Sequence, residues 1–181
     1  FTSNNTDKLK NLETDFNFML RNINTYGNLS GSYKEDADYK VLGSALMNFK
    51  YPLIKTTSES KKYLTPLASF RYSPNKGLNL KNESTTIINF SDLFLIDRIN
   101  NKTVEHGPSA TLGVEFINQD NSNNDKIKFG LALNLRNKED DDLPISSSLG
   151  NKTSDLIGYS GINITENLSL NYNFSVDQNL S

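Results

Sequence analysis

The sequence contains no cysteine, and His106 is its only histidine. The absence of cysteine excludes disulfide bonds, thiolate metal sites and cysteine nucleophiles. Positive and negative side chains nearly balance, with a formal net charge of -2 over 181 residues. A chain with so little net charge has no electrostatic reason to bind nucleic acid, so we expect no nucleic-acid partner.

Long apolar runs are also absent. The longest is Leu93-Phe94-Leu95-Ile96, whereas a membrane-spanning helix needs about 20 consecutive apolar residues. The opening residues, FTSNNTDKLK, lack the basic and apolar regions of a signal peptide, and there is no initiator methionine. We therefore expect residues 1–181 to be cut from a longer protein, as a mature form or as a fragment.

The sequence instead alternates apolar and polar residues with a period of two. In KIKFGLALNLR, residues 126–136, five apolar side chains share one face, because successive side chains of a strand point to opposite faces. Residues 168–177 repeat the pattern, and weaker versions occur at 47–53, 64–72 and 111–116. No window shows a sustained helical period. The pattern predicts an all-β protein of about seven or eight strands.

Long and short connections alternate along the chain. The long ones lie around Asp36, Leu93 and Asp141, and the short ones lie around Ser58, Asn121 and Glu166. In an antiparallel up-and-down sheet, this order places every long loop at one rim and every short turn at the other. Outer-membrane barrels have this asymmetry. The pattern favours a segment of a transmembrane β-barrel, while a soluble sandwich or barrel remains an alternative.

A membrane barrel is apolar outside and polar inside, which predicts the direction of each side chain. The outward set is predicted to include Phe129, Leu131, Leu133, Leu170 and Phe174. The inward set is predicted to include Asn134, Arg136 and Asn171.

Four strings occur in a familiar order: YLTPLASFRYSPN, SDLFLIDR, VEHGPSATLGVEF and DLPISSSLGNKTSDLIGYSGINITENLSLNYNF. Together they resemble the barrel of the LptD family, the lipopolysaccharide-assembly proteins of the outer membrane. The resemblance runs from about Ala45 to Asp177, and residues 1–44 match only as strand and loop. Ser147-Ser148-Leu149-Gly150 stands in an altered order where the family has a Ser-Gly-Leu-rich loop.

This resemblance implies that residues 1–181 are part of one barrel domain in the cell outer membrane. The implied function is that of a wall segment of a translocon that places lipopolysaccharide in the outer leaflet. The implied partners are lipopolysaccharide, the periplasmic lipopolysaccharide bridge and an LptE-type plug lipoprotein. The family's periplasmic jellyroll domain has no counterpart here, and we expect no enzymatic activity and no cofactor. The alternatives are a soluble β-rich binding or adhesion domain, a porin-like barrel and an outer-membrane hydrolase.

The family-like motif of the long central loop contains several residues that we single out: Asp92, Leu93, Phe94, Asp97, Arg98, Glu105 and Gly107. A polar connection of about 30 residues loses entropy on ordering unless it buries something. The apolar residues 93–96 are expected to give it a small core, as a lid folded over the lumen or as an anchor to the rim. The flanking charges Asp92, Asp97 and Arg98 are expected to satisfy backbone groups or to pair with each other.

Two prolines, Pro52 and Pro66, lie inside apparent strands and cannot donate to the hydrogen-bond ladder. They are expected to be strand starts at the periplasmic rim, with weak seams in the wall as the alternative.

Catalytic and metal chemistry have little support. A hydrolase would have to combine His106 with Ser109 or another serine, and Glu105 with His106 supplies only two metal ligands. The acidic run 139–142 could hold calcium or magnesium, but it lacks EF-hand spacing and is expected to be a solvated loop. We expect no catalytic and no metal site.

Overall fold

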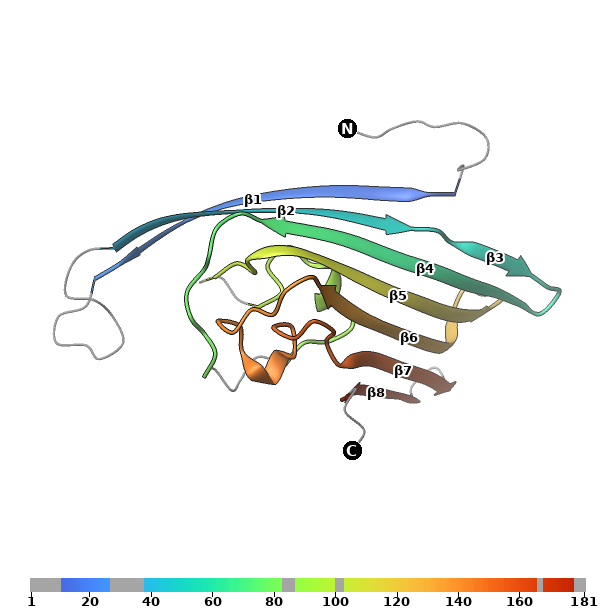
Figure 1. The fold of residues 1–181 in the computed structure, drawn as a ribbon. Coiled ribbons are helices and arrows are strands. Elements are labelled where there is room, and N and C mark those ends of the chain that lie inside the picture. The colour runs from blue at the N-terminus through green and yellow to red at the C-terminus, as the bar shows by residue number, and fades with distance from the viewer. Residues whose placement is uncertain (1–10, 27–37, 83–86, 100–102, 166–167, 178–181) are drawn as a thin grey trace.

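The computed structural model in Figure 1 describes residues 11–26, 38–82, 87–99, 103–165 and 168–177. The described chain is all-β, as predicted, and two short 3-10 turns interrupt its connections. No helix in these ranges is long and apolar enough to cross a membrane. The elements are β1 (Glu13–Thr25), β2 (Asp38–Lys50), β3 (Leu53–Thr56), β4 (Ser60–Ser73), η1 (Asp92–Phe94), β5 (Gly107–Asp120), β6 (Asp125–Arg136), η2 (Ile145–Ser147), β7 (Leu156–Thr165) and β8 (Leu168–Val176).

All strands belong to one antiparallel sheet. The order is β1-β2-β4-β5-β6-β7-β8, and β3 pairs with β4 as a continuation of β2. Each strand therefore lies beside its neighbour in the chain, which confirms the predicted up-and-down topology. The sheet is open, because β1 and β8 each have one neighbour among the described strands.

The described connections follow the predicted sidedness. Register pairs Ser73 with Gly107 at the end of the sheet that carries the connections 74–106 and 137–155. At the opposite end the short turns contact one another, since Asn121 Nδ2 donates to Ser58 O at 2.7 Å. The predicted loop positions Asp36 and Glu166 lie outside the described residues.

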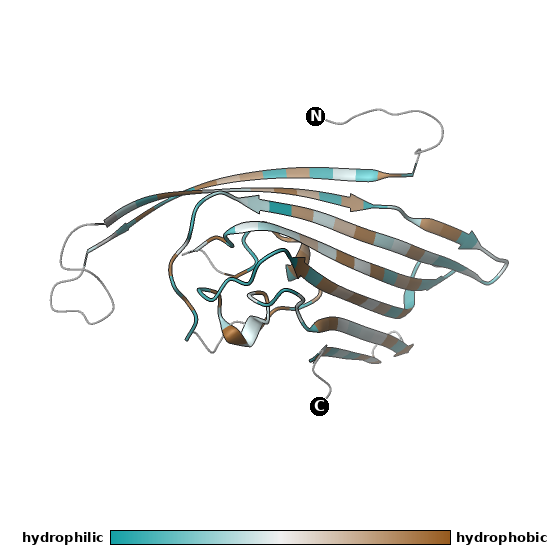
Figure 2. Ribbon diagram, viewed as in Figure 1, coloured by the Kyte–Doolittle hydropathy of each residue, from teal (hydrophilic) through white to brown (hydrophobic). Residues whose placement is uncertain are grey.

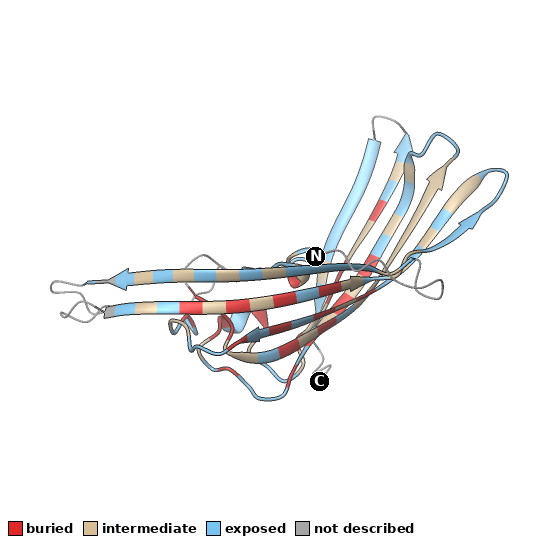
Figure 3. Ribbon diagram, turned by 90° about the horizontal axis from the view of Figure 1, so that it is seen from above, coloured by how far each residue is buried: buried red, intermediate tan, exposed pale blue. Residues whose placement is uncertain are grey.

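Along β6, small and polar side chains are buried and large apolar side chains are exposed, which is the reverse of a strand in a water-soluble sheet. On β6, Ala132 and Asn134 are 2% and 0% exposed, whereas Ile127 and Phe129 are 43% and 38% exposed. Figure 2 shows the alternation of hydropathy along the strands, and Figure 3 shows the matching alternation of burial. The predicted directions are confirmed, because the predicted inward residues Asn134 and Arg136 are buried on the concave face, whereas the predicted outward residues Phe129 and Leu170 are exposed on the other face.

On β8, the same register separates two neighbouring residues. Asn173 lines a cavity on the concave side, whereas the ring of Phe174 lies over Gly158 on the outer face, beside Leu131. On both β6 and β8, the residues predicted to point outward and inward therefore lie on the predicted faces.

The two long connections pack inside the curve of the sheet, where they form the core (Figure 1). Leu93 and Leu149, one from each connection, are fully buried in a cluster with Leu67, Ala132 and Ile157 from the strands. Burial of a leucine side chain contributes about 1.5–3 kcal/mol relative to exposure. The connections therefore supply much of the apolar surface that covers the concave face.

The expectation that both prolines are strand starts at the rim is wrong for Pro66. Pro66 lies inside β4, opposite Val114 of β5, and its carbonyl oxygen accepts a hydrogen bond from Tyr51 N at 3.1 Å. Pro52 lies between β2 and β3, which pair with β4 in one continuous register. Neither proline can donate a backbone hydrogen bond. Because Pro52 and Pro66 lie at neighbouring positions in the register of adjacent strands, the hydrogen-bond ladder is interrupted at one place only.

We predict that Gly113→Ala lowers the free energy of unfolding by about 1–3 kcal/mol, the usual cost of overpacking. A Cβ at Gly113 would lie 2.9 Å from Ala132 Cβ and 3.1 Å from the ring of Phe94. Gly43→Ala is the matched control, because its nearest neighbour would be 3.6 Å away. Denaturant unfolding and proteolysis within residues 87–99 measure the effect. Equal stability of the two variants would contradict this packing of η1.

Candidate functional site

The apolar stretch 93–96 is held on the concave face through its backbone. All four of its carbonyl oxygens accept hydrogen bonds from side chains. The donor and acceptor pairs are Arg98 to Leu93 at 3.0 Å, Asn48 to Phe94 at 3.2 Å, and Arg71 to both Leu95 and Ile96. Because two of these donors stand on β2 and β4, the sheet itself fixes the position of the stretch.

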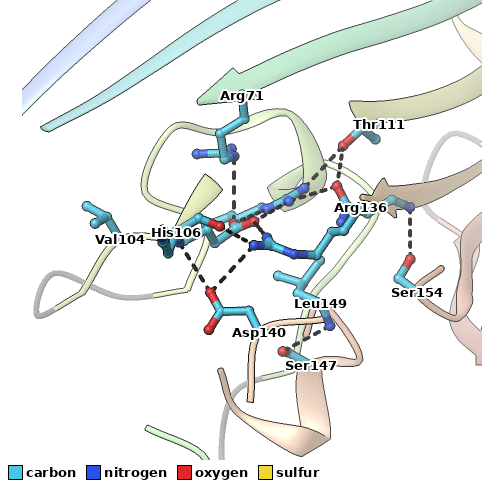
Figure 4. A network of polar contacts seen from close by, with 12 residues as sticks. Arg71, Val104, His106, Thr111, Arg136, Asp140, Ser147, Leu149 and Ser154 are labelled. Carbon is cyan, nitrogen blue, oxygen red and sulfur yellow. Dashed lines mark hydrogen bonds and ion pairs between the residues drawn. The ribbon is translucent and has the colours of Figure 1, made fainter. Parts of the chain in front are cut away.

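Glu105 lies at the centre of a buried polar network and faces three arginines (Figure 4). Arg98 makes a two-pronged contact, with Nε on Oε1 and Nη2 on Oε2 at 2.6 Å. Arg136 Nη1 lies 3.3 Å from Oε2, and Arg71 Nε lies 3.6 Å from Oε1. The last contact is an ion pair and not a hydrogen bond, because Arg71 Nε has no hydrogen-bond partner among the described residues.

Strand side chains complete the network. Arg98 also donates to Thr111 Oγ1 at 3.1 Å and to Asn134 Oδ1 at 2.9 Å. Arg136 Nη2 lies 3.5 Å from Asp140 Oδ2 in the following connection. Residues from β4, β5, β6 and both long connections therefore meet at one point. Three guanidinium groups face two carboxylates, which leaves one positive charge in excess.

The arginines determine the charge state of Glu105. Burial alone raises the pKa of this carboxyl group. The charges of Arg98, Arg71 and Arg136, with the hydrogen bond from Arg98, outweigh burial and lower the pKa to about 2 from an ordinary 4.5. Glu105 is therefore ionised at neutral pH and can hold all three arginines in place.

The loop motif predicted from the sequence is brought together only in part. Leu93 and Phe94 pack in the core, Arg98 and Glu105 form the ion pair, and Leu95 is exposed. Asp97 is also exposed. Of the two roles expected for the flanking charges, Arg98 takes the first, because its Nη1 donates to Leu93 O, and its ion-pair partner is Glu105 instead of Asp92 or Asp97.

Two further residues of the motif have local roles. Asp92 Oδ2 accepts a hydrogen bond from Asn89 N at 3.0 Å, which satisfies a backbone group as predicted. Gly107 opens β5 with φ of +80°, a conformation that residues with a Cβ rarely adopt. The sharp entry into β5 brings the preceding Glu105 over the concave face.

The acidic run 139–142 is not a solvated cluster, and that expectation is wrong for Asp140. Asp140 is buried, pairs with Arg136 and accepts a hydrogen bond from His106 N at 3.2 Å. Asp142 Oδ2 pairs with Lys76 Nζ at 2.6 Å. The described residues contain no group of three potential metal ligands from His, Cys, Asp or Glu side chains. These carboxylates therefore serve to fasten the connections to each other.

The candidate hydrolase pair is not assembled. His106 contributes its backbone to the network, since Arg136 Nη2 donates to His106 O. His106 Nδ1 and Ser109 Oγ have no hydrogen-bond partner among the described residues, so no bond joins them. A general base must lie within hydrogen-bond reach of its nucleophile. The geometry gives no support to a Ser-His mechanism.

A cavity of about 970 Å³ lies on the concave side, beneath the 89–97 segment. Its lining combines carboxylates and amides with aromatic rings. Glu115 Oε1 accepts a hydrogen bond from Tyr159 at 2.6 Å, and the ring of Phe90 packs on Tyr159 with centroids 5.1 Å apart. Strands from β1 to β8 contribute to the walls, so the cavity occupies the interior that a closed barrel would enclose.

The sequence pattern placed Asn134 and Arg136 on the polar face but indicated neither the ion pair of Arg136 with Glu105 nor the hydrogen bond that Asn134 accepts from Arg98. The available signal was their position at the strand ends that meet the long connections. A connection carrying an isolated Glu105 could have been matched to that row of inward arginines, but only a known register brings them to one point.

No protein-family model, no curated protein and no solved structure matches this chain. The geometry of the sheet and its connections, together with the residue strings quoted above, therefore supplies the evidence for a function.

We predict that Glu105→Gln lowers the free energy of unfolding by about 3–5 kcal/mol, the cost of leaving buried charges without their partner. The matched control is Glu139→Gln, because Glu139 is exposed in the neighbouring connection. Denaturant unfolding of both variants measures the difference. A Glu105→Gln chain as stable as the control would show that the arginines need no carboxylate.

Stability should also fall with acid in a defined window. The pKa of Glu105 is lower in the folded chain than its ordinary value, so its stabilising contribution is complete above about pH 4.5 and is lost as pH falls towards about 2. Unfolding measured across this window should show a steeper loss for the wild type than for Glu105→Gln. Parallel curves would indicate that other carboxylates dominate the acid response.

Proposed function

We propose that this chain is a wall segment of an outer-membrane β-barrel, and that the barrel is an LptD-type translocon that assembles lipopolysaccharide into the outer leaflet. The observation that carries the first part is the inverted burial of the two strand faces. The side chains of Asn134 and Arg136 are buried, whereas Leu135 between them is exposed on the outward face. This order suits a solvent that is apolar outside the sheet.

The outward face is too apolar for a soluble domain of this shape. Exposed large apolar side chains occur on every long strand, and contiguous patches of this kind mark interaction or membrane surfaces. They include Phe16, Phe18, Leu20, Met47, Phe70, Tyr72, Leu112, Ile127, Phe129, Ile162, Leu170 and Tyr172. A soluble binding or adhesion domain would have to cover this face with a second layer, and the described residues form a single sheet.

The choice of lipopolysaccharide as cargo is supported by the order of the residue strings and by the interior cavity. The stretch 89–97 closes the cavity toward the long connections, which in this proposal lie on the external side. The periplasmic bridge would then deliver lipopolysaccharide from the short-turn side, and an LptE-type lipoprotein would occupy interior space. These partners and the outer-membrane location remain parts of the proposal.

A porin-like solute channel is the second candidate. The observation that favours it is the polar part of the cavity lining, where the carboxylates of Asp15 and Glu115 and the ammonium group of Lys128 border one space. Charged rings of this sort set ion selectivity in channels.

We predict that Leu112→Arg destabilises the chain in a bilayer by about 2–4 kcal/mol, the cost of arginine at the lipid-facing midplane of a barrel. Leu95→Arg is the matched control, because Leu112 and Leu95 are 48% and 50% exposed and only Leu112 lies on the outward strand face. Folding into phospholipid vesicles, measured by urea titration, gives the difference. Equal tolerance of the two arginines would favour the soluble alternative.

The cargo is tested with photoreactive benzoylphenylalanine placed at two neighbouring positions of β8. Asn173 lines the interior cavity, whereas Tyr172 is on the outward face. In vesicles that contain purified lipopolysaccharide and phospholipid, position 173 should cross-link lipopolysaccharide and position 172 should cross-link mainly phospholipid. Solute leakage without a lipopolysaccharide cross-link at 173 would favour the porin-like function.

A further inference from the structure

Two lysines face each other across the hairpin of β3 and β4, at the end of the sheet that carries the short turns (Figure 1). The register pairs Lys55 directly with Lys62, and both side chains are exposed. Directly opposed residues of antiparallel strands have Cβ atoms about 4.5–5.5 Å apart, and like charges in such a pair are destabilising. An anion between the two ammonium groups would remove this repulsion.

Both lysines point to the outward face. Residues at every second position of β4 share a face, and β4 pairs with β5 without a register shift. Lys62 therefore lies on the same face as Phe70, which is 58% exposed on the outward side, and Lys55 shares this face as the opposite residue. Lys61 points to the concave side, and its Nζ donates to Asn123 Oδ1 at 2.9 Å. The neighbours Lys61 and Lys62 thus present the same side chain to opposite faces of one strand.

The two outward lysines have no side-chain hydrogen bond or ion pair among the described residues. By contrast, Lys126, which also lies near the short turns, pairs with Asp120 at 3.2 Å. Glu59, in the turn of the hairpin, is exposed and forms no ion pair among the residues that the structure describes. Two cations and one anion therefore leave one positive charge in excess at this end of the hairpin.

The lysine pair lies at the border of the apolar outward surface. One row nearer the middle of the strands, Leu53 pairs with Leu64, and Leu64 pairs with Phe116. Leu53 and Leu64 are 44% and 43% exposed. The outward surface thus changes from apolar to cationic over one row. Lysines at the ends of membrane-spanning segments extend their ammonium groups to the headgroup layer in this way.

We infer that Lys55 and Lys62 together bind the phosphate group of an anionic phospholipid of the inner leaflet, whose acyl chains lie along Leu53, Leu64 and Phe116. The inference rests on the proposed function, in which the long connections are external and the outer leaflet contains lipopolysaccharide. The short turns then lie on the periplasmic side, beside the leaflet that contains phospholipid. The inference does not depend on the cargo that the interior carries.

The charge of the site selects an anionic headgroup. Phosphatidylglycerol carries one negative charge, on its phosphate, and this charge balances the excess left by Lys55, Lys62 and Glu59. Phosphatidylethanolamine is zwitterionic, so it would leave the excess unbalanced and would bring a third ammonium group beside the two lysines. Hydrogen bonds from ammonium groups to phosphate are stronger than hydrogen bonds between neutral groups.

The experiment uses the full chain in nanodiscs that contain equal amounts of phosphatidylglycerol and phosphatidylethanolamine with identical acyl chains. The lipids that the chain retains after mild detergent extraction are counted by native mass spectrometry. We expect phosphatidylglycerol to be enriched over phosphatidylethanolamine by roughly fivefold to tenfold, a ratio within reach of two lysines beside an anionic headgroup.

Three variants separate the lysine pair from positive charge in general. Lys62→Gln should reduce the enrichment to less than about twofold, because one lysine is left to hold the phosphate. Lys61→Gln removes the same charge from the opposite face of β4 and should leave the enrichment unchanged. Lys62→Arg keeps the charge and should retain the enrichment. Lys62→Gln also removes the repulsion within the hairpin, so urea unfolding should show a variant at least as stable as the wild type.

A soluble competitor distinguishes a lipid site from a site for any phosphodiester. Glycerophosphoglycerol is the headgroup of phosphatidylglycerol without acyl chains. In excess it should not displace the retained phosphatidylglycerol, because the chains along Leu53 and Leu64 hold the lipid in place. Displacement would show that the lysines bind the phosphodiester alone and would overturn the assignment to a lipid.

Further results would also overturn the inference. These are enrichment of phosphatidylethanolamine, enrichment of neither lipid, equal loss of enrichment in Lys62→Gln and Lys61→Gln, or loss of enrichment in Lys62→Arg. A wild-type chain that does not enter the nanodisc at all would instead overturn the proposed membrane function. The two failures are therefore distinguishable in the same experiment.

Discussion

Glu105 is buried among three arginines, and this single carboxylate allows their charges to be buried on the concave face. Guanidinium groups cannot be neutralised by losing a proton at ordinary pH, so their burial requires an anion and acceptors nearby. Glu105 supplies the anion, and the carbonyl groups of residues 93–96 supply acceptors to Arg71 and Arg98. Ion pairs and hydrogen bonds therefore hold the connection in place, and its apolar side chains fill the space between it and the strands.

The same requirement explains why the apolar run is compact. A short segment whose carbonyl groups all face polar donors must turn its backbone toward the sheet. Leu93 and Phe94 can still reach the core from such a segment, while Leu95 turns away from it. A lid that is fixed through its backbone tolerates changes in its side chains more easily than one that is fixed by side-chain packing alone.

Period-two alternation was sufficient to predict the strands, the topology and the facing, because each depends on local spacing. The rows on β6 and β8 show this, and so does the alternation of loop lengths. The contacts of Arg98 were not predictable in the same way, because period-two spacing does not indicate which residue of a long connection its partner is, and that partner is Glu105. Asp140 was misjudged for a related reason, because an acidic run looks solvated until a strand end brings Arg136 beside it. Pro66 was misjudged because the neighbouring Pro52 relieves the ladder at the same level.

The interior network and an apolar groove of about 470 Å³ on the outward face share the same strand ends. On β4, Arg71 turns inward to the network and Tyr72 turns outward to the groove; on β6, Arg136 and Leu135 divide in the same way. Because consecutive side chains of a strand share one stretch of backbone, a displacement of these ends moves both faces together. The interior network and the outward face are therefore linked through the backbone of two strands, β4 and β6.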